Sequence, residues 1–276
     1  MLSSGRSGTS YLTHLIRSNT HCVARHEPYL DIGNPTLFGR PIHHGLTDQS
    51  ELLELLQKKR SWIERHGRPN YFEANHALVK AAHELLATCF PEAWYLHVVR
   101  NPLEVAKSEA NREELLDQWR FPGRRYRSDE GDRLLRWALT GEEDIYRCFG
   151  EGSLSRFQWY VVQWIEIENR IARLLNRENI RRRCFFLDMP SDLGDEEKLQ
   201  SMLTFFAFER RARGERSGLS FPSRRNRTPR RPTIITEHDR RQFHAVVECL
   251  PRAHLRIFSG PPYDKLGWRH LLPSLA

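Results

Sequence analysis

The first residues of the chain form a segment rich in glycine and hydroxyl side chains that runs directly into a helix-like pattern. Residues 4–10 are S-G-R-S-G-T-S, and apolar side chains then recur at helical spacing at Tyr11, Leu12, Leu15 and Ile16. Glycines let the backbone turn sharply and approach a ligand, and the unpaired amides at a helix start attract anions. The segment predicts a phosphate-binding loop made by Gly5, Arg6, Ser7, Gly8, Thr9 and Ser10. A Ser- and Gly-rich turn that only caps the helix is the alternative.

This loop differs from the loop of ordinary nucleoside triphosphatases, G-x-x-x-x-G-K-[ST]. Thr9 stands where that motif needs lysine, and Ser3 stands where it needs glycine. A nucleoside triphosphatase is therefore disfavoured. The segment instead resembles the 5′-phosphosulfate-binding loop, R-S-G-T-[ST], of sulfotransferases that use 3′-phosphoadenylyl sulfate (PAPS).

A second segment further along the chain supports the same resemblance. The apolar run Trp94–Val99 suits a buried strand, and it is followed by Arg100, an Asn-Pro turn and a helix that carries Ser108. This resembles the 3′-phosphate-binding motif of PAPS-dependent sulfotransferases, in which a serine lies eight positions after the arginine. Both motifs follow predicted strands, whose carboxyl ends meet at one crevice in an α/β sheet. The chain is therefore identified as a member of this family. Its phosphate loop, and the distance from that loop to a glutamate described below, most resemble those of the tyrosylprotein and carbohydrate sulfotransferases.

The resemblance implies a reaction and a co-substrate. The chain would move a sulfuryl group from PAPS to an acceptor hydroxyl by in-line displacement, leaving adenosine 3′,5′-bisphosphate, without a metal. Arg6 would neutralise the charge that grows on the departing 5′-phosphate oxygen. Many relatives carry a lysine near the end of the third strand, where Asn75 and His76 stand here. Two roles are open for Asn75 and His76: they contact the leaving group, or they form a hydrogen-bond network at the end of the strand.

Glu27 is the candidate general base. It follows the predicted strand Cys22–Arg25 at a turn before Pro28 and lies 21 positions after Arg6. In the tyrosylprotein branch the catalytic Glu follows the loop Arg at this spacing. A carboxylate there can accept the hydroxyl proton when its pKa is near the working pH. The alternative without a catalytic role is that Glu27 is a solvated loop carboxylate. His26 is the neighbouring candidate for the base, but the alternation of side chains along a strand would place it on the opposite face.

Strand and helix patterns alternate along the chain. Strands are expected near Cys22–Arg25, Tyr71–Ala74, Trp94–Val99 and Cys184–Leu187. Helices are expected near Gly8–Ser18, Glu51–Arg65, Leu78–Cys89, Leu103–Trp119, Leu154–Leu175 and Glu237–Cys249. The alternation predicts an α/β fold, a three-layer sandwich with a mostly parallel central sheet. Only Met1 and Leu2 precede Ser3, so the first strand is expected to be truncated or a stub.

Length and composition fit one enzyme domain, residues 1–276, with 39% hydrophobic residues. No run of eighteen uncharged apolar residues and no secretory segment is visible, which predicts a soluble, cytoplasmic protein, or one of the Golgi lumen if the N-terminus is truncated. Five scattered cysteines without a C-x-x-C pair disfavour a zinc ribbon or a disulfide framework. No H-E-x-x-H occurs among the thirteen histidines, so no metal site is expected.

The net charge of +8 is most concentrated between Arg210 and Arg231. The resemblance implies that a basic segment here folds over the 3′-phosphate, with Arg225 the named candidate. Nucleic-acid binding is the competing interpretation, and it is disfavoured because Phe221 is the one aromatic residue in the segment. The strongly apolar stretch around Trp159, Tyr160, Val161, Trp164 and Ile165 is expected to be core rather than an acceptor pocket.

Two functions remain open on the sequence. One is sulfuryl transfer to a carbohydrate, a tyrosine or a small alcohol or phenol, with an acidic acceptor among the options. The other is a non-catalytic relative that holds a nucleotide or a sulfated ligand without turnover. The oligomeric state is left open.

Overall fold

The computed structural model describes residues 1–27, 49–118, 125–127, 133–135, 138–150, 152–211, 218–222 and 233–272. The chain folds into two compact units, and helices alternate with small parallel sheets as expected for an α/β protein. The first unit comprises Met1–Val99 and Leu174–Arg227, and the second comprises Arg100–Arg173 and Thr228–Ala276. The expected single domain over 1–276 stays a prediction.

Two parallel strands bring distant segments of the first unit together. The strand β1 (Val23–His26) pairs with β2 (Tyr71–Ala74) in a register that places Val23 opposite Tyr71 and His26 opposite Ala74. Since parallel strands end at the same edge of a sheet, the residues that follow β1 and β2 lie next to each other. This edge carries the acid–base candidates.

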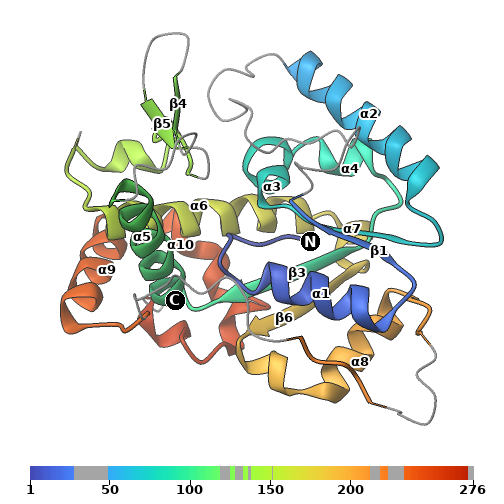
Figure 1. The fold of residues 1–276 in the computed structure, drawn as a ribbon. Coiled ribbons are helices and arrows are strands. Elements are labelled where there is room, and N and C mark those ends of the chain that lie inside the picture. The colour runs from blue at the N-terminus through green and yellow to red at the C-terminus, as the bar shows by residue number, and fades with distance from the viewer. Residues whose placement is uncertain are drawn as a thin grey trace. The chain divides into compact units, whose positions relative to one another are not determined.

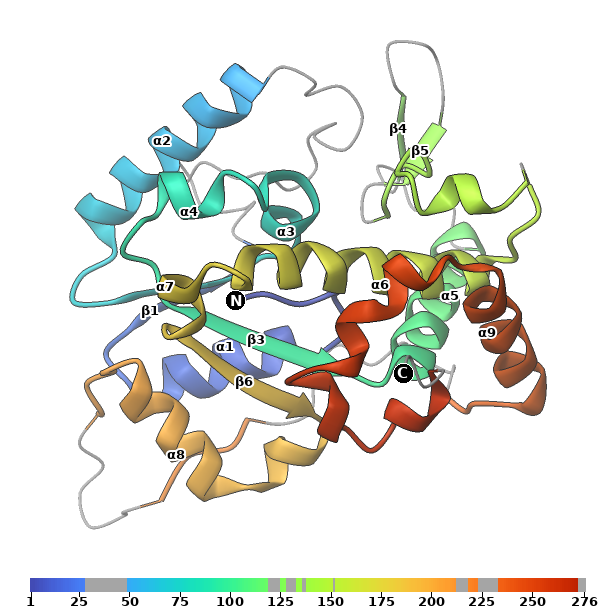
Figure 2. The same cartoon turned by 180° about the vertical axis from the view of Figure 1, so that it is seen from behind.

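A second sheet of the first unit is made by β3 (Tyr95–Arg100) and β6 (Cys184–Met189), whose arrows point the same way in Figure 2. Leu2 forms a single parallel bridge with this sheet: its N–H donates to Leu96 (2.8 Å) and its carbonyl accepts from Val98 (3.0 Å). The Met1 nitrogen donates to the carbonyl of Glu73 in β2, at 2.7 Å. Residues 1 and 2 thus connect the two sheets, and the expected first strand is present as one bridge residue.

The helices of the first unit pack in two apolar clusters. One cluster joins the two sheets to α1 and α8 through side chains such as Leu12, Val98 and Met202. The other joins α2, α3 and α4, which lie close together in Figure 1, through Leu56, Ala77 and others. The helices are α1 (Thr9–Asn19), α2 (Gln49–His66), α3 (His76–Ala82), α4 (Leu86–Cys89), α7 (Glu178–Arg181) and α8 (Glu196–Phe205), with the 3-10 turn η2 (Ser191–Gly194).

The second unit is mainly helical, and its centre is the apolar side of one long helix, α6. Tyr160, Val161, Trp164 and Ile165 of this helix are at most 1% exposed, so the expected core interpretation is confirmed for them. Trp164 stacks on Phe258 with ring centroids 5.1 Å apart. The helices are α5 (Pro102–Gln118), α6 (Arg156–Leu175), α9 (Glu237–Cys249) and α10 (Arg252–Leu255). The short elements are β4 (Arg125–Arg127), β5 (Arg133–Leu135), η1 (Tyr146–Cys148), η3 (Arg256–Ser259), η4 (Tyr263–Lys265) and η5 (Arg269–Leu271).

The helix expected over Leu78–Cys89 is two helices. It begins earlier because the Asn75 side chain caps α3 by accepting from the amide of Ala77 at 3.1 Å. It is interrupted because Leu85 bonds to the carbonyl of Ala82, three positions back, which tightens the turn between α3 and α4. The other expected strands and helices occur within two residues of their predicted ends.

In the part of the chain that the structure describes, no helix is both long and apolar enough to cross a membrane. The five cysteines, Cys22, Cys89, Cys148, Cys184 and Cys249, are free thiols.

Candidate active site

The predicted phosphate loop is a tight, mostly buried turn that leads into α1. Gly5 and Gly8 have φ values of 94° and 78°, the left-handed conformation that glycine adopts without strain. Gly8 also lies close to β6, because a Cβ there would be 2.3 Å from Cε of Met189. The Ser7 hydroxyl donates to the carbonyl of Gly5 at 2.8 Å. The loop is therefore folded by its own glycines and serines.

One loop hydroxyl is buried without a partner. Ser4 is 1% exposed, and its Oγ forms no hydrogen bond in the part of the chain that the structure describes. A buried hydroxyl of this kind costs free energy until something pairs with it.

Both residues predicted to take part in catalysis have strained backbones. Arg6 and Glu27 have φ values of 51° and 43°, and Ala207 is the only other non-glycine residue with positive φ among those described. Such conformations cost about 1–3 kcal/mol each and are common at active sites. The strain thus coincides with the two positions that the sequence singled out.

Thr9, the last threonine of the loop motif, contacts the end of β1. Its Oγ1 lies 2.9 Å from Nε2 of His26. Burial lowers the pKa of His26 below its ordinary value of 6.5; the charge of Glu27 raises it, and nearby positive charges add to the lowering. His26 is consequently neutral near pH 7, with one ring nitrogen facing the loop.

Glu27 contacts His76 across the edge where β1 and β2 end. Glu27 Oε1 lies 2.6 Å from Nδ1 of His76, and the two side chains are 16% and 10% exposed. The Glu27 amide also donates to the carbonyl of Ala74 at 2.9 Å, which extends the strand pairing by one residue. The carboxylate is thus held in one orientation rather than solvated in a loop. The sequence did not predict this contact, because it depends on the pairing of β1 with β2.

Glu73 belongs to a buried network and is not available as a base. Lys59 of α2 lies 2.8 Å from its Oε2, and the two side chains are 2% and 6% exposed. The Tyr71 hydroxyl donates to the same oxygen, and Asn75 Nδ2 donates to Oε1 at 3.0 Å. Asn75 is thus part of a strand-end hydrogen-bond network, one of the two roles that the sequence left open for it, whereas His76 contacts Glu27.

The residues of the second motif lie at the start of α5. Arg100 ends β3, and Pro102 is the first residue of the helix, as predicted. Arg100 donates from Nε (2.9 Å) and Nη2 (2.6 Å) to one oxygen of Glu104, one turn along the helix. Ser108, a further turn along, is 5% exposed. Arg100 thus contacts the first turn of α5 through Glu104, and Ser108 lies one turn after Glu104 on the same helix.

Arg225 and most of the basic segment between Arg210 and Arg231 lie outside the described residues. Arg211 is described at its start, and its Nε donates to the carbonyl of Thr20 at 2.7 Å.

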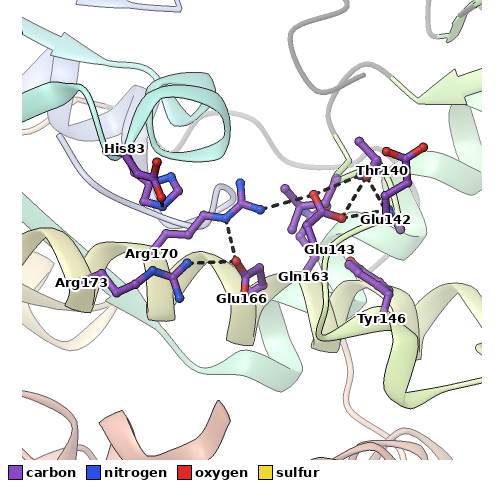
Figure 3. Close-up of polar contacts among 12 residues, drawn as sticks. His83, Thr140, Glu142, Glu143, Tyr146, Gln163, Glu166, Arg170 and Arg173 are labelled. Atoms are coloured by element: carbon purple, nitrogen blue, oxygen red, sulfur yellow. Dashed lines mark hydrogen bonds and ion pairs between the residues drawn. The ribbon is translucent and has the colours of Figure 1, made fainter. Parts of the chain in front are cut away.

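A network of charged residues in the second unit was not predicted from the sequence (Figure 3). Arg170 of α6 donates to Glu166 at 2.8 Å and to Glu143 at 3.4 Å, and Arg173 donates to Glu166 at 3.2 Å. Glu143 also accepts from the hydroxyl of Thr140 at 3.1 Å. Because the opposite charges are paired and Glu143 closes the 140–143 turn, the network fixes this turn on α6.

Among the described residues, no group of three or more His, Cys, Asp or Glu side chains is arranged to hold a metal ion. No family model, no curated protein and no solved structure matches the chain.

Proposed function

We propose that this protein is a PAPS-dependent sulfotransferase with a P-loop-like phosphate site in a three-layer α/β fold. The observation that carries the proposal is local to the first unit. Thr9 of the phosphate loop contacts His26, and the next residue, Glu27, contacts His76 at the same edge of the sheet. One hydrogen bond thus joins the anion-binding loop to His26, and the oriented carboxylate belongs to the next residue along the chain. In-line transfer requires the reacting groups to be held close together in this way.

The first motif would hold the 5′-phosphosulfate. Loop amides of residues 5–10 and the hydroxyls of Thr9 and Ser10 would be the donors, and Arg6 would be the charge that meets the leaving oxygen. Ser7 would join them by giving up its bond to the carbonyl of Gly5. Arg100 and Ser108 would hold the 3′-phosphate, and Arg225 is a further candidate for it. Charge-assisted hydrogen bonds of this kind are about twice as strong as neutral ones.

In the proposed reaction the acceptor oxygen forms a bond to sulfur while the bond from sulfur to the 5′-phosphate oxygen breaks. The electron pair of the broken bond leaves on that oxygen, where Arg6 neutralises it. The hydroxyl proton passes to Glu27, the general base that the sequence assigns. His76 orients the carboxylate through its Nδ1 contact, and it is the second candidate for the proton acceptor.

A non-catalytic nucleotide-binding relative is the alternative. The pairing of Arg100 with Glu104 bears on both functions alike, because a 3′-phosphate must share or displace this internal carboxylate in either case. Calorimetric titration with adenosine 3′,5′-bisphosphate and a transfer assay with radiolabelled PAPS separate the two. Binding together with transfer to any acceptor in a panel of carbohydrates, tyrosine peptides and phenols supports the enzyme. Binding without transfer to any of them supports the alternative.

A further inference from the structure

The contact between Thr9 and His26 constrains how the phosphate loop can bind an anion. Thr9 is the first residue of α1, and His26 is the last residue of β1. Among the described residues, the Thr9 hydroxyl is the one hydrogen-bond partner of the His26 ring, at 2.9 Å. This side-chain hydrogen bond therefore joins the loop to the strand that precedes Glu27.

The direction of this hydrogen bond determines whether the Thr9 hydroxyl can donate a hydrogen bond to a ligand. A threonine hydroxyl has one proton and two lone pairs. If Thr9 donates to an unprotonated Nε2, its oxygen presents only lone pairs to a ligand and repels a phosphate. If Nε2 carries a proton and donates to Thr9, the hydroxyl proton is released and can be donated to the phosphate. An anion that bonds to Thr9 consequently selects a form of His26 with a proton on Nε2, which is either that neutral tautomer or the doubly protonated ring.

We infer that His26 is a positioning residue that makes the Thr9 hydroxyl a donor to the bound phosphate, and that anion binding in the loop adds a proton to His26. The inference rests on the proposed donor site. It extends that proposal by naming a residue outside both motifs and a linkage between ligand binding and pH.

Electrostatics favours an added proton on His26 when an anion is bound to the loop. Glu27, His76, His14 and Arg17 are the charged or titratable groups that act on His26, and burial keeps its pKa below 6.5 when no ligand is bound. A phosphate bonded to Thr9 would lie within about 4–6 Å of Nε2, where an opposite charge raises the pKa of a histidine. Each unit by which the ligand raises that pKa strengthens binding about tenfold at low pH relative to high pH.

The test is titration calorimetry of the full chain with adenosine 3′,5′-bisphosphate between pH 5.5 and 8, in buffers of different ionisation enthalpy. Three proteins are compared: the wild type, His26→Gln and His21→Gln. Glutamine offers an N–H to Thr9 but does not titrate. His21 is an exposed histidine just before β1, so it is a matched control. The ligand phosphates and the other histidines titrate equally in all three proteins.

We expect the wild type and His21→Gln to take up protons on binding and to lose about tenfold more affinity than His26→Gln as the pH rises. At pH 5.5 the three affinities should agree within about threefold, since the glutamine amide replaces the donor. Equal proton uptake and equal pH dependence in all three proteins would overturn the inference while leaving the donor site intact. If neither this ligand nor inorganic phosphate binds the wild type at any pH, the proposed donor site fails, and the inference fails with it.

A second measurement does not depend on the variant being folded. The His26 ring is titrated by NMR in the wild type, with and without adenosine 3′,5′-bisphosphate. The inference predicts that the ligand raises the pKa of His26, and an unchanged or lowered value contradicts it.

Discussion

Glu27 and His76 are joined by a 2.6 Å contact between Oε1 and Nδ1, at the edge where β1 and β2 end. The contact follows from the register of the strands: His26 lies opposite Ala74, so the residues after each strand are neighbours. A carboxylate held in this way has one defined orientation, which a general base requires. The pair thus gives Glu27 a structural setting that a solvated loop carboxylate would not have.

Arg100→Ala should weaken the binding of adenosine 3′,5′-bisphosphate more than the binding of adenosine 5′-phosphate, because the substitution removes a contact to the 3′-phosphate alone. A hydrogen bond to a charged group is worth roughly 1.5–3 kcal/mol, so the affinity should fall on the order of tenfold to a hundredfold. Ser108→Ala should give a smaller loss of the same sign. Calorimetric titration of both nucleotides measures the difference.

The control for Arg100 is Arg147→Ala, which removes an exposed arginine of the same unit that pairs with Asp144. It should leave both affinities unchanged. Equal losses for the two nucleotides in Arg100→Ala would contradict the assignment of Arg100 to the 3′-phosphate.

Arg6→Ala should reduce both donor affinity and transfer rate, because the same charge meets the bound phosphate and the developing leaving-group oxygen. Arg6→Lys should recover part of each, since a point charge remains although the planar fork is lost. Steady-state kinetics with radiolabelled PAPS measure both quantities. Unchanged turnover in the alanine variant would refute the catalytic role.

Gly8→Ala should destabilise the protein by about 1–2 kcal/mol, because alanine is strained at the left-handed conformation that Gly8 adopts. The new methyl group would also displace Cε of Met189. Urea unfolding measures the change. The control is Gly194→Ala, where a Cβ meets no atom within 4 Å and φ is not positive. The account of the loop is wrong if both variants are equally stable.

The pairing of α5 with α9 should make the stability of the second unit depend on pH. Burial raises the pKa of Asp239, but hydrogen bonds from Lys107 and Thr236 outweigh it and leave the pKa below 3.8. A carboxyl whose pKa is depressed in the folded state contributes stability above its unfolded value, and this contribution is lost as the pH falls through the folded value. Asp239→Asn should therefore be less stable than the wild type at pH 7 by roughly 1.5–3 kcal/mol.

The difference between Asp239→Asn and the wild type should shrink as the pH is lowered below 3.8. Urea unfolding at pH 7 and in the acid range measures it. A difference that stays constant with pH would show that the Asp239 charge does not contribute.

The local elements were predictable because their causes lie within a few residues of sequence. The strand Tyr71–Ala74 and the helix Glu237–Cys249 have the predicted bounds, and the glycines of the phosphate loop adopt the conformations for which they were singled out. The helix Glu196–Phe205 was not predicted, although Asp195 caps it by accepting from the amide of Lys198. An acidic residue before an acidic first turn was the signal for it.

The contacts of the site were less predictable, because they depend on which strands pair. No spacing rule joins Glu27 to His76 or Thr9 to His26, and Lys59 reaches Glu73 only because α2 packs beside β2. The pairing of Arg100 with Glu104 is an exception. It joins residues four apart across the start of α5, a spacing that the sequence alone displays.

The central claim is tested most directly by Glu27→Gln, which keeps the side-chain size and removes the proton acceptor. Glu54→Gln, an exposed carboxylate of α2 that pairs with Lys58, is the matched control. Binding of adenosine 3′,5′-bisphosphate should be nearly intact in both variants. Sulfuryl transfer from radiolabelled PAPS to an aliphatic alcohol should fall by roughly 10² to 10⁴ in Glu27→Gln alone, with a smaller loss for acidic nitrophenols. Near-wild-type turnover of Glu27→Gln on the aliphatic alcohol would contradict the account and leave His76 and His26 as the candidate bases.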